Sequence, residues 1–242
     1  MLISDANEDL FLAYSVVRED VDALLRHLQH LQKHYATLSA EEQAAFYYTT
    51  RAGFNATRPD WCYRSYRPEW VGRAAQFFVL NRLCFNGLYR VNSRAEFNVP
   101  FGKYHTLSFP SAEGLRAAAR VLQRTIVQCG DFAVSTDFAD ERTLIYLDPP
   151  YRPITPTSSF TTYARQAFDD ADQMRLAAHF RELTRRGSLV MLSNSDPLTA
   201  TGDDFFEKLY ADFTISRLRA ARAINANGAG RGTVSELLIT NY

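Results

Sequence analysis

The sequence has no excess of charge of either sign. Its 27 lysines and arginines balance 27 aspartates and glutamates, so bulk charge neither favours nor excludes a nucleic-acid partner. Cysteine is scarce: the three residues of this type are unevenly spaced and form no Cys-x-x-Cys pair, which argues against a disulfide framework or a zinc site. No apolar run approaches the roughly 20 residues of a membrane-spanning helix, and the start lacks the pattern of a signal peptide. We therefore expect a cytoplasmic protein.

The charge is unevenly distributed along the chain. Residues 1–62 carry nine acids and five bases, whereas residues 63–104 carry seven bases and two acids. Residues 217–232 contain four arginines and no acid. Two basic segments on a neutral chain are typical of a protein that contacts phosphates with part of its surface, although a merely solvated face has the same composition.

The spacing of apolar residues predicts helices in the first half of the chain and alternating strands and helices in the second. Apolar positions from Leu10 to Leu31 recur at spacings of three and four, which indicates an amphipathic helix that begins near Asn7 and is broken near Asp20. A short strand is expected before it. Further helices are expected at residues 40–50, 70–85, 111–123, 169–186 and 205–209, and strands within 126–134 and at 143–147, 188–193, 213–218 and 234–240.

These elements favour an α/β fold. The antiparallel pair that closes the chain indicates a mostly parallel sheet with a reversed edge strand. With 242 residues, 46% of them hydrophobic, the chain is long enough for one such domain plus a small inserted module. We expect residues 1–36 and 112–242 to form the α/β domain and residues 37–111 to form the insertion.

The sharpest local feature is Asp148-Pro149-Pro150-Tyr151, which directly follows the apolar strand Leu144–Leu147. In an open α/β sheet, ligands bind beyond the carboxyl ends of the strands. Two prolines remove two backbone donors, so nearby carbonyls are left as acceptors beside the carboxylate. These acceptors can hold both hydrogens of an exocyclic amine, and Tyr151 offers a flat face for stacking. The tetrapeptide therefore predicts a site for an aminopurine or aminopyrimidine that has been flipped out of its stack.

A second segment, residues 81–104, narrows the prediction. It reads Asn-Arg-Leu-Cys-Phe-Asn-Gly-Leu-Tyr-Arg-Val-Asn-Ser-Arg-Ala-Glu-Phe-Asn-Val-Pro-Phe-Gly-Lys-Tyr. Together with the downstream Asp-Pro-Pro-Tyr, it resembles the Dam-type DNA adenine methyltransferases, and the resemblance extends over essentially the whole chain. It implies a Rossmann-like, S-adenosylmethionine-dependent enzyme of prokaryotic or phage origin that methylates adenine in duplex DNA at a GATC-like site, without a metal. Cytosine amino methylation is the chemical alternative, which the second segment disfavours.

The resemblance implies that part of the insertion contacts DNA. Phe85 takes the place of an aromatic wedge near the target adenine, and Arg90 suits bidentate recognition of a guanine. On residue type alone, Phe85 is also compatible with a core position and Arg90 with a surface salt bridge. The implied DNA-binding residues are Phe85, Asn86, Leu88, Arg90, Pro100, Lys103, Tyr104, Arg222 and Arg231.

The same resemblance implies a catalytic and a cofactor site. Asp148 and the Pro149 carbonyl would hold the amine, and Tyr151 would stack on the adenine. Asp5 takes the place of a carboxylate that binds the ribose hydroxyls, with a helix N-cap as its alternative role. The implied catalytic residues are Asp148, Pro149, Pro150 and Tyr151. The implied cofactor-binding residues are Asp5, Asp137, Phe138 and Asp148, and Phe160, Tyr163 and Phe168 match the loop after the tetrapeptide.

The family has two further elements that this sequence lacks: an N-terminal segment with a Gly-rich, Lys-containing motif, and a Gly-rich loop after the first strand. No Phe-x-Gly-x-Gly loop, and no first strand before it, precedes Leu2-Ile3-Ser4-Asp5. We therefore expect a sheet without its central first strand and weak S-adenosylmethionine binding by this chain alone. A misplaced start codon, a split or decayed gene, and a second chain that supplies the missing elements are the competing explanations. The alternative function is an inactive DNA-binding remnant, and a restriction–modification, phage or housekeeping role stays open.

Overall fold

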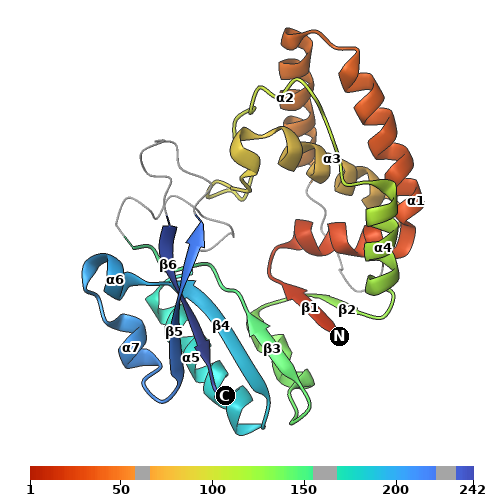
Figure 1. Ribbon diagram of the computed structural model, residues 1–242. Helices are drawn as coiled ribbons and strands as arrows, with labels where there is room; N and C mark the ends of the chain where they lie inside the picture. Colours follow the sequence, from red (N-terminus) through yellow and green to blue (C-terminus); the bar gives the residue numbers. More distant parts are fainter. Residues whose placement is uncertain (58–65, 155–167, 222–232) are drawn as a thin grey trace. The chain divides into compact units, whose positions relative to one another are not determined.

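The computed structural model describes residues 1–57, 66–154, 168–221 and 233–242 (Figure 1). The described chain divides after Asp131 into two compact units, and each is described by itself. The predicted insertion, residues 37–111, lies wholly in the first unit, and its boundaries stay a prediction. No helix within the described ranges is long and apolar enough to cross a membrane.

The first unit is mainly helical. Helix α1 packs against α3 and α4 and also contacts a small parallel sheet, in which Leu2 pairs with Ile126 and Asp5 with Cys129 (Figure 1). The elements of this unit are β1 (Leu2–Asp5), α1 (Glu8–Ala36), α2 (Ala40–Ala56), α3 (Trp70–Leu83), the short 3-10 helix η1 (Phe85–Gly87), α4 (Ala112–Leu122) and β2 (Ile126–Cys129).

Helix α1 confirms two predictions from the sequence. Asn7 is its N-cap, because the side-chain oxygen of Asn7 accepts hydrogen bonds from the backbone N–H groups of Asp9 and Leu10 at 3.0 and 3.3 Å. Asp20 interrupts the helix with φ −147° and ψ 55°. Its carboxylate accepts a hydrogen bond from the N–H of Ala23 at 3.2 Å, so Asp20 caps the helical turns that follow it.

Two apolar clusters stabilise the first unit. The first joins α1, from Phe11 to Leu28, to α3, α4 and the β1–β2 sheet. The second joins the end of α1 to α2, the second half of α3 and the irregular chain after it. All its buried members except Tyr35 come from residues 37–111, which gives that stretch an apolar core. Its largest fully buried side chains are Tyr35, Tyr47, Phe54, Leu80, Leu83 and Phe97.

The second unit is a four-stranded sheet with helices. Helix α5 packs on β4, and its buried face, including Leu176 and Phe180, fills an apolar cluster with Ile145 and Val190 of the sheet. The elements are η2 (Phe132–Phe138), β3 (Leu144–Leu147), α5 (Asp170–Arg185), β4 (Leu189–Ser195), α6 (Pro197–Thr201), α7 (Phe205–Leu209), β5 (Thr214–Ala221) and β6 (Thr233–Thr240).

The order of strands in this sheet is β3-β4-β6-β5, with β3 and β4 parallel and β6 antiparallel to both of its neighbours. Our prediction of a reversed edge strand is therefore wrong: the reversed strand β6 is internal, and β5 forms the edge. The side chains explain the order. Leu237 and Ile239 of β6 are buried, whereas β5 exposes Arg217 and Arg219, and charged side chains suit an edge strand.

The described strands form a two-stranded sheet in the first unit and a four-stranded sheet in the second. β1 pairs with β2, and β3 pairs with β4, and within the described residues neither β1 nor β3 has a second strand partner. An α/β fold is confirmed. The expectation of a missing central strand stays a prediction.

Candidate active site and recognition segment

Asp148 lies directly after β3, at the carboxyl end of this strand, and is exposed. Ser193 of the neighbouring strand β4 donates a hydrogen bond to Oδ1 of Asp148 at 2.8 Å, and the hydroxyl oxygens of Ser193 and Tyr146 lie 2.9 Å apart. Of the described residues, Ser193 alone donates a hydrogen bond to this carboxylate. One oxygen of Asp148 is therefore fixed, and Oδ2 is left for a ligand.

The carbonyls of the two prolines have different environments. Gln173 of α5 donates a hydrogen bond to the Pro150 carbonyl at 3.2 Å, and Asn194 of β4 donates to the side-chain oxygen of Gln173 at 3.2 Å. No described residue donates a hydrogen bond to the Pro149 carbonyl. An unused acceptor therefore lies next to the carboxylate of Asp148, while the Pro150 carbonyl serves to anchor the tetrapeptide on the helix.

Tyr151 is 37% exposed, and its hydroxyl donates a hydrogen bond to the Glu236 carboxylate of β6 at 3.4 Å. Partial burial raises the pKa of Tyr151, so the ring stays a neutral phenol across the physiological range. The next residue, Arg152, forms salt bridges to Asp170 at 2.7 Å and to Asp203 at 2.6 Å. These bonds tie the chain that follows Tyr151 to the start of α5 and to the loop before α7.

Asp5 ends strand β1 and is half-buried. Its Oδ1 accepts a hydrogen bond from the backbone N–H of Asn7 at 2.7 Å. Because Asn7 caps α1, the alternative role of Asp5 as the N-cap is wrong. Burial raises the pKa of Asp5, and the hydrogen bond from Asn7 opposes this shift only in part. A carboxylate at a strand end with one donor suits two neighbouring hydroxyls.

The remaining cofactor candidates, Asp137 and Phe138, are both exposed at the end of η2, in the same unit as Asp148. The Ser135 hydroxyl lies 2.8 Å from Nε2 of His179 on α5, which anchors η2 to that helix. The Phe138 carbonyl accepts a hydrogen bond from the Thr143 hydroxyl at 2.9 Å. The structure thus brings Asp137, Phe138 and Asp148 into one unit, whereas Asp5 belongs to the other.

Residues 84–105, here called the recognition segment, form an irregular chain in the first unit. Apart from η1, its regular pairing consists of single bridges between Cys84 and Phe101 and between Val91 and Phe97. A left-handed turn with φ 56° at Asn86 and φ 62° at Gly87 follows the exposed Phe85. The segment is therefore irregular and has no continuous strand ladder.

Side chains of α2 supply the hydrogen bonds that a regular strand ladder would otherwise provide. Asn55 donates to the Phe97 carbonyl at 3.0 Å and accepts from the Phe97 N–H at 2.8 Å. Tyr47 and Arg51 donate to the Val99 carbonyl at 2.7 and 3.1 Å. Sequence reasoning missed these three supporting residues, because a polar side chain on a helix carries no local sign of a partner about 50 positions away.

The structure places the main predicted DNA-binding side chains at the surface. Phe85 is 45% exposed and Tyr104 is 41% exposed, so Phe85 is not a core aromatic residue. Nε of Arg90 donates a hydrogen bond to Oδ1 of Asn98 at 2.8 Å, and Arg90 forms no salt bridge with any described residue. Pro100 and Lys103 are exposed, and Asn86 and Leu88 are half-buried. Arg222, Arg231, Phe160 and Tyr163 lie outside the described residues.

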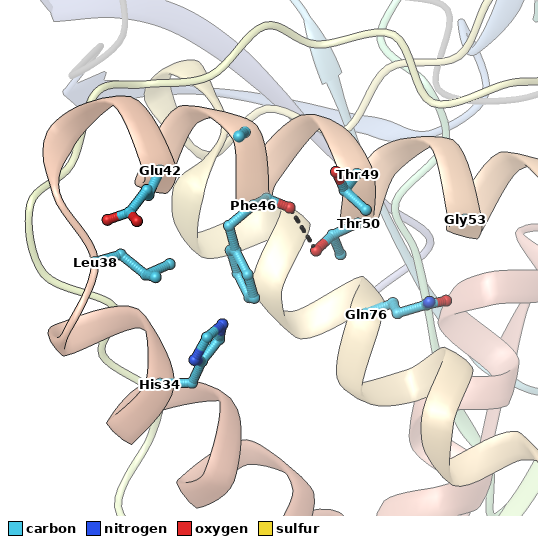
Figure 2. A pocket seen from close by; sticks show the side chains of 9 residues that line it. His34, Leu38, Glu42, Phe46, Thr49, Thr50, Gly53 and Gln76 are labelled. Carbon is cyan, nitrogen blue, oxygen red and sulfur yellow. Dashed lines mark hydrogen bonds between the residues drawn. The ribbon is translucent and has the colours of Figure 1, made fainter.

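A pocket of about 560 Å³ lies on the helical part of the first unit, and none of the predicted site residues lines it (Figure 2). The edge of the His34 ring faces Phe46, and the Thr50 hydroxyl donates a hydrogen bond to the Phe46 carbonyl at 2.8 Å. The pocket is lined by His34, Leu38, Glu42, Ala45, Phe46, Thr49, Thr50, Gly53 and Gln76. Within the described residues, no group of His, Cys, Asp and Glu side chains could hold a metal ion.

An α/β protein with Asp-Pro-Pro-Tyr at the carboxyl end of a strand has the arrangement of enzymes that methylate an exocyclic amine of a base. Residues 1–224 match the family of D12 class N6 adenine-specific DNA methyltransferases, and the chain therefore belongs to this family. The resemblance drawn from the sequence is confirmed. S-adenosylmethionine is the methyl donor of such enzymes, and the N6 amine of adenine in DNA is the acceptor.

Several relatives named as methyltransferases or DNA adenine methylases match almost the whole chain. The chain is 43% identical to the type II methyltransferase M.MjaIII of Methanocaldococcus jannaschii over 243 residues. This match spans 100% of the chain and 80% of the relative. The chain is 33% identical to the type II methyltransferase M1.LlaDCHI of Lactococcus lactis subsp. cremoris, with 100% and 79% covered. It is 32% identical to the DNA adenine methylase of Escherichia coli strain K12, with 98% and 77% covered.

Proposed function

We propose that this protein methylates the N6 amine of adenine at a GATC-like site in duplex DNA, acting on an adenine flipped out of the helix. The observation that carries the proposal is the pair of unused acceptors at the end of β3: Oδ2 of Asp148, whose Oδ1 is held by Ser193, and the neighbouring Pro149 carbonyl. Two acceptors match the two hydrogens of an exocyclic amine. The target sequence is supported by the likeness of the recognition segment to that of the Dam-type enzymes.

The catalytic contribution of the chain is to position the amine and exclude water. Asp148 and Pro149 accept hydrogen bonds from the two N6 hydrogens, which orients the nitrogen lone pair, and the Tyr151 ring stacks on the base. S-adenosylmethionine supplies an electrophilic methyl group on a sulfonium. Transfer of the methyl group from sulfur to nitrogen would break the S–CH3 bond and release S-adenosylhomocysteine. The N6 proton that the product must lose would pass to Asp148, the one acceptor of the pair that carries a negative charge. Holding the reactants in line accounts for most of the acceleration.

We assign the cofactor contacts to four residues. Asp5 accepts hydrogen bonds from the ribose hydroxyls, for which its half-buried carboxylate with one backbone donor is suited. Asp137 and Phe138 flank the cofactor's adenine, Phe138 with an exposed ring that is available for stacking. Asp148 borders the methyl group.

DNA recognition is assigned to the recognition segment. Phe85 wedges into the duplex beside the extruded adenine, while Arg90 and Leu88 read base edges. Residues 63–104 contain seven lysines and arginines but only two acidic residues, and this excess of positive charge attracts the DNA phosphates. The remaining contacts are assigned to Asn86, Pro100, Lys103, Tyr104, Arg222 and Arg231.

An Asp148→Ala variant tests the proposed function. We expect it to lose methyl incorporation into GATC-containing duplexes while it keeps most DNA affinity, because the carboxylate contacts only the flipped base. Asp140→Ala, which removes an exposed carboxylate eight residues earlier, is the matched control and should keep wild-type activity. Retention of most turnover by Asp148→Ala would exclude the assigned role. Specific DNA binding by the wild type without any methyl incorporation would instead favour the inactive DNA-binding remnant.

A further inference from the structure

A buried polar cluster lies in the first unit, where its two apolar clusters meet. Asp9, in the first turn of α1, is 8% exposed, and Arg73 of α3 is 7% exposed. Nε of Arg73 donates a hydrogen bond to Oδ1 of Asp9 at 2.8 Å. Arg73 also donates to the carbonyls of Phe54 and Thr57 at the end of α2, at 2.7 and 3.1 Å. The pair thus joins α1, α2 and α3 at a single point.

The second oxygen of Asp9 contacts the recognition segment. The Tyr89 hydroxyl donates a hydrogen bond to Oδ2 of Asp9 at 3.3 Å. The Tyr89 ring packs against Phe77 at 5.8 Å and Phe97 at 5.7 Å, so it faces the core. The guanidinium of the next residue, Arg90, donates a hydrogen bond to the side chain of Asn98 rather than to that of Asp9. Tyr89 is therefore one point at which the chain that carries Leu88 and Arg90 is attached to the helical core.

We propose that Asp9 is a positioning residue for target recognition, acting through Tyr89 on the chain that carries Leu88 and Arg90. The proposal rests on the proposed function, in which Leu88 and Arg90 read bases. Arg73 holds one oxygen of Asp9, which leaves the other in a defined place for the Tyr89 hydroxyl. The segment has isolated bridges in place of a strand ladder, so an anchored side chain beside Arg90 helps to set where the Arg90 guanidinium lies relative to the DNA.

The geometry explains why a charged pair occupies this position. A buried carboxylate needs partners for both oxygens, and here one partner is a rigid guanidinium while the other is a hydroxyl of the recognition segment. An apolar replacement would pack the three helices equally well but would give Tyr89 no directional bond. The cluster therefore supplies orientation that the surrounding apolar contacts cannot.

The test measures DNA discrimination by purified variants. The preferred site is first selected by wild-type protein from a pool of randomised duplexes, and the affinities for that site and for a scrambled duplex are then compared by fluorescence anisotropy. Tyr89→Phe keeps the ring and removes only the hydroxyl. We expect it to lower the ratio of the two affinities roughly tenfold, with little change in affinity for the scrambled duplex. Asp9→Asn should lower the ratio at least as much.

Two comparisons separate positioning from general stability. Val16→Ala removes buried methyl groups from α1, in the apolar cluster that contains no residue of the recognition segment, and it should lower the melting temperature but leave the ratio unchanged. If it lowers the ratio as much as Tyr89→Phe does, Asp9 has only a structural role. The Tyr89→Phe, Asp9→Asn double variant should have an affinity ratio no lower than that of the single variant with the lower ratio. The reason is that Asp9 acts through Tyr89, so the second substitution removes nothing more.

Three further outcomes overturn the inference. Additive losses in the double variant would show that Asp9 does not act through Tyr89, and an unchanged ratio in Tyr89→Phe would refute the positioning role while the proposed function stands. If the wild type enriches no sequence at all, the proposed function itself fails, and the inference fails with it.

Discussion

Arg90 and Asn98 are joined across the recognition segment by one side-chain and one backbone hydrogen bond. Nε of Arg90 donates to Oδ1 of Asn98 at 2.8 Å, and the backbone N–H of Asn98 donates to the Arg90 carbonyl at 3.1 Å. This arrangement occupies Nε and leaves the two terminal nitrogens of the guanidinium in a fixed orientation. A preoriented fork of this kind matches the two acceptors of guanine in the major groove.

Arg90→Ala is expected to relax discrimination at one base pair, at a cost of about 1–3 kcal/mol in binding to the preferred site. Asn98→Ala should have a smaller effect in the same direction, because the arginine remains but loses its orientation. Arg94, whose side chain is 79% exposed, lies in the same segment, and Arg94→Ala serves as the control that should leave discrimination between base pairs unchanged. Binding assays with single base-pair substitutions check this. Equal loss on all sequences would mean that Arg90 contacts only phosphate.

Ser193→Ala should lower kcat for methyl transfer by roughly 10- to 100-fold and leave KM for DNA unchanged. The reason is that Asp148 loses the donor that fixes Oδ1, and a hydrogen bond to a charged group is worth about 1.5–3 kcal/mol. Ser193→Thr keeps the hydroxyl and should restore most of the rate. Ser216→Ala, an exposed serine in β5 of the same sheet, should behave as wild type. A parallel rise in KM would place Ser193 in DNA binding instead.

Gly102→Ala should disturb the end of the recognition segment. A Cβ at this position would lie 2.8 Å from the Cys84 carbonyl oxygen and 2.3 Å from a ring carbon of Tyr104. The ring can rotate away but the backbone carbonyl cannot, so we expect a loss of about 1–3 kcal/mol in unfolding free energy together with weaker DNA binding. Gly72→Ala in α3 is the control, because no atom of the described residues lies within 4 Å of the added carbon apart from its chain neighbours and the helix's own backbone. Chemical denaturation measures the unfolding free energy of the two variants, and a DNA-binding assay measures their affinity. A Gly102→Ala variant with wild-type stability would contradict the packing described.

Cys84 should resist alkylation in the native protein. Burial raises the pKa of its thiol from the ordinary 9.0 to about 11, so at pH 8 only about one molecule in a thousand carries the reactive thiolate. Because the folded pKa lies above the unfolded one, the stabilisation associated with the neutral thiol is complete below pH 9 and is lost as the pH rises towards 11. Iodoacetamide labelling followed by mass spectrometry, with urea-unfolded protein as the reference, checks this. Rapid labelling of native Cys84 would show that the segment opens.

The sequence determined most of the local structure. The Asn7 cap, the break at Asp20 and the helix Phe205–Leu209 are local signals, since each depends on residues within one or two turns. The tetrapeptide that begins at Asp148 and the recognition segment likewise identified the family, because side-chain chemistry at fixed spacing is visible without a fold.

Tertiary structure decided what depends on distant partners. It placed β6 inside the sheet, for which the only trace in the sequence was that β5 carries Arg217 and Arg219. It also placed Ser193 on the Asp148 carboxylate, 45 residues away, and Tyr89 on Asp9, 80 residues away. A hydrogen bond needs a partner within about 3 Å in space, and no periodicity or motif records which distant residue the packing of helices and strands will bring to that distance.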